Sequence, residues 1–305
     1  MSVLQEFLTV SLALVLAGLA WAFLRAGKVE SPARRSRRGI EINGVLRKLL
    51  QHIQMHRGMA SIILNGDGSF NAKLKAKQGD INDELRVMAD KTPAARDLFV
   101  GAPLERIQSD WEMLRVQALQ LTVSESFERH SALIQQVLHL IADVAERSQL
   151  DVGGPVPHAL SDMLWRRLPE LAEDLGKARA IGSGVAAAGQ VSGVDRIRLN
   201  FLVNRIRSGL KAMQAAISED TGNRFGGEAH QSASRVQTSV DRLLQMIESK
   251  LIAAERPNLS AATYFSAATD ALEVVYRLYD SASAGLARPK GHRETVSAFG
   301  AVRTA

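Results

Sequence analysis

The chain has 305 residues, of which 46% are hydrophobic and 23% charged, and it contains no cysteine. The lack of cysteine excludes disulfide frameworks, iron–sulfur clusters, thiolate zinc sites and cysteine nucleophiles. Of the formal net charge of +6, residues 25–38 carry +5 and the tail from residue 288 carries +3, so residues 39–287 are nearly neutral. This distribution does not favour a basic surface for DNA or RNA.

The first predicted element is a membrane helix. Residues 7–24, FLTVSLALVLAGLAWAFL, are uncharged, and 18 helical residues span about 27 Å, enough for a hydrocarbon core. A cleaved signal peptide is the alternative, but Glu6 precedes the apolar run and no Lys or Arg does. We therefore expect a membrane anchor over residues 1–27 and a basic juxtamembrane linker over residues 28–39.

The linker also predicts the topology. Its Arg and Lys residues directly follow the apolar run, so the positive-inside rule places the amino terminus outside and the rest of the chain in the cytoplasm. We expect a single-pass protein of a bacterial inner membrane. Small residues four apart in the span are compatible with a homodimer: Ala13, Ala17, Gly18 and Ala22.

Beyond residue 39, helical periodicity and regular turn signals predict helices only. A first four-helix unit, residues 40–150, contains helices Ile40–Asn65, Ser69–Lys91, one around Trp111 and Ser124–Ser148. A second unit, residues 151–286, contains a helix from Pro157 to Ala188 kinked at Pro169, one after Ser192, and two more, Glu228–Ala254 and Ser260–Leu286. The fold class is all-α: a transmembrane helix, two consecutive antiparallel four-helix bundles and a basic flexible tail over residues 287–305.

The two units look like copies of each other. The segment Arg57-Gly58-Met59-Ala60-Ser61 stands near the end of the first long helix, and Arg179-Ala180-Ile181-Gly182-Ser183 stands near the end of the fifth. Both read Arg, small, apolar, small, Ser, and both precede a turn with glycine and a new helix. The equivalent placement indicates an internal duplication.

This pattern suggests an anion site. Arg and Ser at i and i+4 share one helix face, and two guanidinium groups that meet between small residues repel each other unless an anion joins them. The candidate ligands of a nitrate-like anion are Arg57, Ser61, Arg179 and Ser183. The alternative is that each arginine pairs with a local carboxylate, such as Asp174 or Glu173 for Arg179, or lies on a solvated face.

Three stretches resemble the nitrate- and nitrite-sensing (NIT) domain and related bacterial sensor regions: Leu50–Ser61 with the polar residues as far as Asp80, Leu164–Arg179, and Tyr264–Asp270. The resemblance covers roughly residues 40–285. It implies a double helical bundle that senses nitrate or nitrite through arginines, and Arg57 and Arg179 match that role best. The sequence departs from the family at His56, where Glu or Gln is expected, and it shows no second apolar run or output module.

Two classes of function follow. In the first, a membrane-anchored sensor binds an oxyanion between the halves and relays the change to a partner protein. In the second, the chain is a membrane-tethered helical scaffold for an envelope or receptor assembly and binds no small molecule.

The sequence predicts neither an enzyme nor a cofactor. It lacks a phosphate loop, a nucleophile elbow and a paired-carboxylate site. His52 and His56 have the i, i+4 spacing of a metalloprotease helix, but HIQMH lacks the glutamate base and a third ligand. We therefore expect no metal site.

Overall fold

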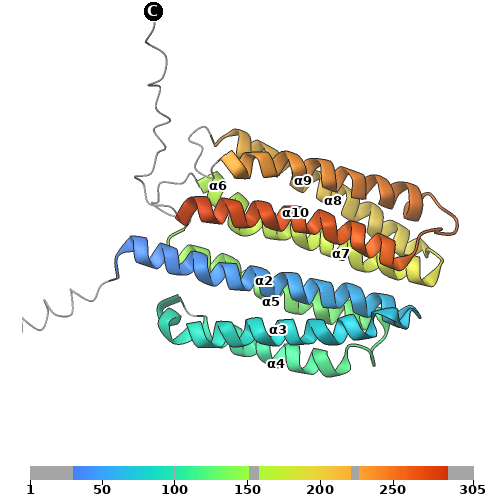
Figure 1. The fold of residues 1–305 in the computed structure, drawn as a ribbon, viewed down its shortest axis with the longest axis horizontal. Helices are drawn as coiled ribbons and strands as arrows, with labels where there is room; N and C mark the ends of the chain where they lie inside the picture. The colour runs from blue at the N-terminus through green and yellow to red at the C-terminus, as the bar shows by residue number, and fades with distance from the viewer. Residues whose placement is uncertain (1–29, 99, 151–157, 221–226, 288–305) are drawn as a thin grey trace, which may run out of the picture.

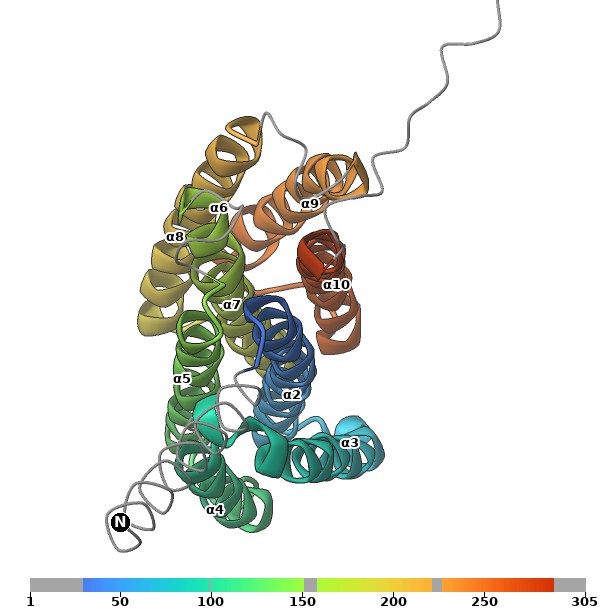
Figure 2. The same ribbon diagram turned by 90° about the vertical axis from the view of Figure 1, so that its left-hand side faces the viewer.

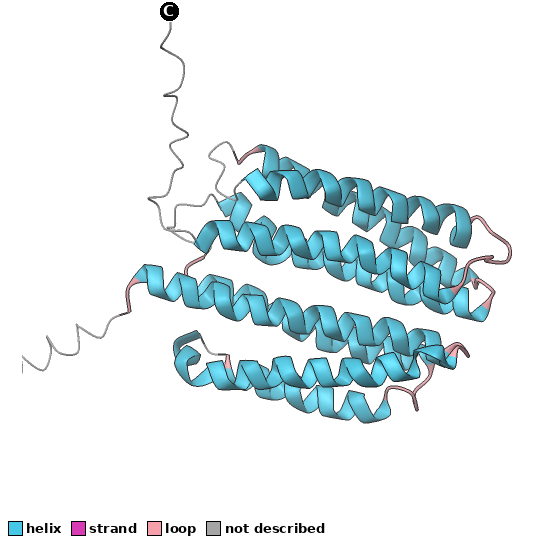
Figure 3. Ribbon diagram, in the orientation of Figure 1, coloured by secondary structure: helices cyan, strands magenta, loops and turns pink. Residues whose placement is uncertain are grey.

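The computed structural model describes residues 30–98, 100–150, 158–220 and 227–287. Within these ranges every regular element is a helix, so the predicted all-α class is confirmed (Figure 3). The α-helices and the π-helical segments that extend two of them are α2 (Pro32–Leu64), α3 (Asn71–Lys91), α4 (Gly101–Gln117), α5 (Val123–Arg147), α6 (His158–Asp162), η3 (Met163–Arg167), α7 (Leu168–Ala188), α8 (Gly193–Ser218), α9 (Gly227–Met246), η4 (Ile247–Ile252) and α10 (Ala261–Ala287). Two short 3-10 turns, Gly68–Phe70 and Thr92–Leu98, flank α3.

Helix α2 begins at Pro32, whereas the sequence predicted a start at Ile40 after a flexible linker. The Ser31 side chain accepts a hydrogen bond from the Arg34 backbone N–H, and proline follows it in the first turn. This serine cap and the preset φ of proline start a helix despite four arginines in the next six residues. The basic stretch from Pro32 onward is therefore part of α2.

The predicted kink at Pro169 takes the form of a π-helical segment, η3, that joins α6 to α7. Proline has no N–H to donate and its ring clashes with the carbonyl four residues earlier, so the turn before it widens. Trp165, in η3, is buried.

The helices lie nearly along one common direction (Figure 1). Seen end-on, α2 and α7 occupy the centre (Figure 2). Helix α2 packs against α3, α5 and α7, and α7 packs against α8 and α10. One hydrophobic core runs through all of these helices, so the two sets of four share their interior. The division into units at residues 40–150 and 151–286 stays a prediction.

None of the helices in the described ranges is long and apolar enough to cross a membrane. The predicted membrane helix at residues 7–24 and the predicted tail beyond residue 287 lie outside the described residues.

Candidate functional site

The predicted arginines both lie at the contact between α2 and α7, where glycines leave room for them. A Cβ on Gly176 of α7 would lie 3.0 Å from Arg57 Nη2, and a Cβ on Gly58 of α2 would lie 3.5 Å from Arg179 Nε. Each arginine thus lies close to a glycine of the opposite helix. Both side chains are among the largest that are fully buried, at 1% exposure each.

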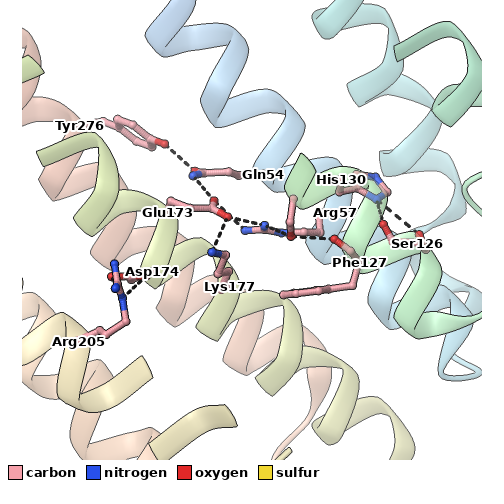
Figure 4. Close-up of polar contacts among 11 residues, drawn as sticks. Gln54, Arg57, Ser126, Phe127, His130, Glu173, Asp174, Lys177, Arg205 and Tyr276 are labelled. Carbon is pink, nitrogen blue, oxygen red and sulfur yellow. Dashed lines mark hydrogen bonds and ion pairs between the residues drawn. The ribbon is translucent and has the colours of Figure 1, made fainter. Parts of the chain in front are cut away.

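Arg57 donates hydrogen bonds to its neighbours through both terminal nitrogens (Figure 4). Its Nη1 and Nη2 donate to Glu173 of α7 over 2.7 and 3.0 Å, and Nη1 also donates to Ser131 Oγ of α5 at 2.9 Å. The guanidinium carbon lies 5.1 Å from the centre of the Phe127 ring. Only Nε has no hydrogen-bond partner. A two-oxygen carboxylate thus fills the fork of Arg57.

Glu173 connects this pair to a wider buried network. Gln54 donates to it at 2.9 Å, and the Lys177 ammonium lies 3.6 Å away. The hydroxyl of Tyr276, on α10, donates to Gln54 Oε1 at 2.6 Å. Polar contacts therefore run from α10 through α2 and α7 to α5 in the interior (Figure 4).

Arg179 has a different environment. Its Nη1 donates to Thr269 Oγ1 of α10 at 3.1 Å, and its guanidinium carbon lies 5.0 Å from the centre of the Phe265 ring. Nε and Nη2 have no partner, and no carboxylate among the described residues pairs with this arginine. Burial, together with repulsion from Arg57, lowers the Arg179 pKa to about 10. This arginine is a buried cation with two N–H groups unused.

The carboxylates that the sequence offered to Arg179 are used elsewhere. Glu173 binds Arg57. Asp174 accepts from Arg205 Nε of α8, with N–O distances of 3.1 Å to Oδ1 and 2.9 Å to Oδ2. Sequence spacing suggested Glu173 as a partner on its own helix, whereas packing directs it to the neighbouring helix α2.

The two predicted serines also differ. Ser61 donates to the Ala180 backbone carbonyl at 2.8 Å and so joins α2 to α7. Ser183 is fully buried, and its hydroxyl has no partner. Ser183 stands one turn after Arg179 on α7, so the second copy of the motif contains an unused hydroxyl as well as an unused guanidinium edge.

A buried histidine pair, which the sequence did not predict, lies beside Arg57. His130 Nδ1 lies 2.6 Å from the Ser126 carbonyl, and His130 Nε2 lies 2.8 Å from His56 Nδ1. Because the carbonyl requires a proton on His130 Nδ1, His130 Nε2 is the acceptor and His56 Nδ1 the donor. Gln78 Nε2 lies 3.3 Å from His56 Nε2 and donates to it. This arrangement suits two neutral imidazoles, and burial lowers the pKa of both, that of His56 to about 3.

A cavity of about 420 Å³ opens at the end of the bundle, next to this interior. Ser61 and Phe127 line it, as do Asp195 and Arg198 at the start of α8. Phe127 therefore separates the Arg57 guanidinium from the cavity. Within the described residues, no cluster of three or more His, Asp or Glu side chains could hold a metal ion.

Comparison with known proteins identifies a family whose model matches this chain. The family model described as nitrate and nitrite sensing matches residues 48–287. Among curated proteins, none matches this chain. A solved structure, described as the structure of the NasR transcription antiterminator, aligns with 88% of this chain and 73% of its own, at 18% sequence identity and a TM-score of 0.66. At that identity the likeness concerns the fold alone.

Proposed function

The chain belongs to the nitrate and nitrite sensing family, and we propose that it senses a small oxyanion of the nitrate and nitrite class between its two sets of helices. The resemblance of the sequence around Arg57 and Arg179 to this domain is thereby confirmed. Family membership supports a sensory and non-enzymatic role.

The observation that carries the proposal is the state of Arg179. A buried charge without a paired countercharge costs several kcal/mol, and this guanidinium is 1% exposed with Nε and Nη2 unused. Two N–H donors in one plane fit two oxygens of a planar oxyanion, and the low dielectric of the interior strengthens such bonds. Nitrate or nitrite would supply the missing negative charge.

The other predicted ligands, Ser183, Arg57 and Ser61, contribute to the proposed site in different ways. The Ser183 hydroxyl, unpartnered and one turn away, is a second donor. Arg57 adds positive potential close to Arg179, since burial and, after it, repulsion from Arg57 lower the pKa of Arg179. Ser61 holds α2 against α7 through the Ala180 carbonyl, so it keeps the two arginines at one interface.

Sensing requires that the anion bind one packing of the helices better than another. The α2–α7 contact joins the two sets of helices, so an anion there would change how tightly they hold together. We propose that a partner protein reads this change at the membrane to which the predicted segment at residues 7–24 anchors the chain.

The test is anion binding by the full chain in mild detergent, measured by calorimetry and by thermal shift. We expect nitrate and nitrite to bind and to raise the melting temperature, with chloride weaker. Arg179→Gln should abolish both effects, and Arg86→Gln, which alters an exposed pair with Asp83, should preserve them. Indifference of the wild type to all three anions would refute the proposal.

A second candidate, the tethered scaffold, is favoured by an exposed apolar surface. On α8, Val194, Ile197 and Phe201 are 57%, 71% and 61% exposed, and they lie at i, i+3 and i+7 on one helix face. Four more exposed apolar residues lie on α4, α5 and the connection between them: Met113, Val116, Leu119 and Val123. Exposed apolar residues on one helix face favour contact with a partner protein. A scaffold predicts that no anion alters the stability of the chain.

A further inference from the structure

The two arginines lie in matching surroundings. Arg57 has the Phe127 ring at 5.1 Å and donates to the hydroxyl of Ser131, four residues later on α5. Arg179 has the Phe265 ring at 5.0 Å and donates to the hydroxyl of Thr269, four residues later on α10. In each half, the last helix therefore places an aromatic ring and a hydroxyl, one helical turn apart, against the arginine. We call each set of Arg, Phe and hydroxyl residue a cradle.

In the second cradle the protein leaves part of the guanidinium without a partner. The centre of the Phe265 ring lies 5.0 Å from the guanidinium carbon, and the Thr269 hydroxyl accepts a hydrogen bond from Nη1. In the second cradle Nε and Nη2, which share one edge of the guanidinium, are buried and have no hydrogen-bond partner. A planar oxyanion can lie in the plane of that edge, whereas a tetrahedral one places oxygens out of the plane and towards the ring.

In the first cradle, an oxyanion is already present. The Glu173 carboxylate is planar, carries one negative charge and binds Nη1 and Nη2 through separate oxygens, as a nitrate ion would. Glu173 stands six residues before Arg179, and the residue six before Arg57 is Gln51. Gln51 is uncharged and accepts from Arg47 at 2.8 Å. The position equivalent to Glu173 thus supplies no charge to the second cradle.

We propose that the chain contains two copies of one oxyanion cradle, the first closed by Glu173 and the second, made of Arg179, Phe265 and Thr269, open to the diffusible ligand. This rests on the proposed function and adds the residues that orient the ligand. Thr269 fixes the guanidinium, and Phe265 selects a flat ion. One anion binds per chain because the other position is taken by the protein itself.

The experiment is a nitrate titration of the full chain in mild detergent, with the number of bound ions determined by calorimetry. The wild type should bind one nitrate, and sulfate at least ten-fold more weakly. Glu173→Ala removes the carboxylate that occupies the first cradle, so this variant should bind two. The matched control, Asp174→Ala, removes the neighbouring carboxylate that binds Arg205 and should still bind one.

Thr269→Val tests the second cradle without disturbing Glu173, and it provides the test if Glu173→Ala does not fold. Losing the hydroxyl that holds Nη1 should weaken nitrate binding about ten-fold, which corresponds to one hydrogen bond. One nitrate in Glu173→Ala at wild-type affinity, or unchanged affinity in Thr269→Val, would overturn the cradles while leaving the proposed function intact. Absence of nitrate binding in every variant and in the wild type would instead refute the proposed function.

Discussion

Arg57 of α2 and Glu173 of α7 form a two-pronged ion pair, with N–O distances of 2.7 and 3.0 Å, in which both side chains are at most 2% exposed. The pair crosses between the two sets of helices and forms the centre of the buried polar network. Its burial determines how the protein should respond when one partner is removed.

Arg57→Met should destabilise the chain by about 3–5 kcal/mol, because it leaves the Glu173 carboxylate buried with only Gln54 and Lys177 beside it. The double variant Arg57→Met/Glu173→Leu removes both charges and should cost much less than the sum of the single changes. Denaturant unfolding of the four proteins in the cycle measures this. Arg86→Met, in an exposed pair, should change the unfolding free energy by less than about 0.5 kcal/mol. Additive single effects would show that the pair is not coupled.

The contact of α10 with α7 predicts a contrast between two helical glycines. A Cβ on Gly182 would lie 2.4 Å from the Tyr264 ring, so Gly182→Ala should cost about 1–3 kcal/mol. A Cβ on Gly44 of α2 would meet nothing within 4 Å, so Gly44→Ala should stabilise the helix by about 0.5–1 kcal/mol. Urea unfolding distinguishes them, and equal effects would contradict the close packing at Gly182.

The sequence predicted the helices well because their signals are local. Ser192 was expected before a helix and caps α8, and Thr92-Pro93 was expected to end α3, which stops at Lys91. The early start of α2 was missed because four nearby arginines resemble a linker, whereas the cap at Ser31 determines the local structure. The widened turn η3 before Pro169 was predicted only as a kink.

The site was predicted in part, since Arg57 and Arg179 both lie at the interface between α2 and α7. The hydrogen-bonding partners of the two arginines were not predicted, because they depend on helix packing. Packing places Glu173 against Arg57 and leaves Arg179 without a carboxylate partner among the described residues. One signal was available: a phenylalanine followed four residues later by a hydroxyl residue occurs in the last helix of each half, at Phe127 and Phe265.

The buried histidines predict a loss of stability in mild acid. Burial holds the His56 pKa at about 3 and the His130 pKa well below 6.5. Below about pH 6.5 the unfolded chain binds protons that the folded chain does not, so stability is complete above that pH and falls as the pH decreases towards the folded pKa values. Each histidine should contribute a loss of about 2 kcal/mol between pH 6.5 and pH 5.

Chemical denaturation across this pH range provides the measurement. The double variant His56→Leu/His130→Leu should show a markedly flatter dependence on pH than the wild type. His139→Leu, which changes an exposed histidine of α5, should leave the slope as it is. The same slope in all three proteins would mean that the pair is not held neutral.

Arg57 and Arg179 are equally buried, yet their removal should have opposite effects. In buffer without nitrate, Arg179→Met replaces an unpaired buried cation by an apolar side chain, so it should be neutral or stabilise the chain by about 1–2 kcal/mol. With nitrate at 100 times its dissociation constant, the wild type should gain about 2.7 kcal/mol and the variant nothing, which reverses their order. Unfolding titrations with and without nitrate measure the free energy of unfolding of both proteins under each condition. Destabilisation by Arg179→Met in nitrate-free buffer, as large as that of Arg57→Met, would show that the protein itself satisfies this guanidinium and has no need of an anion.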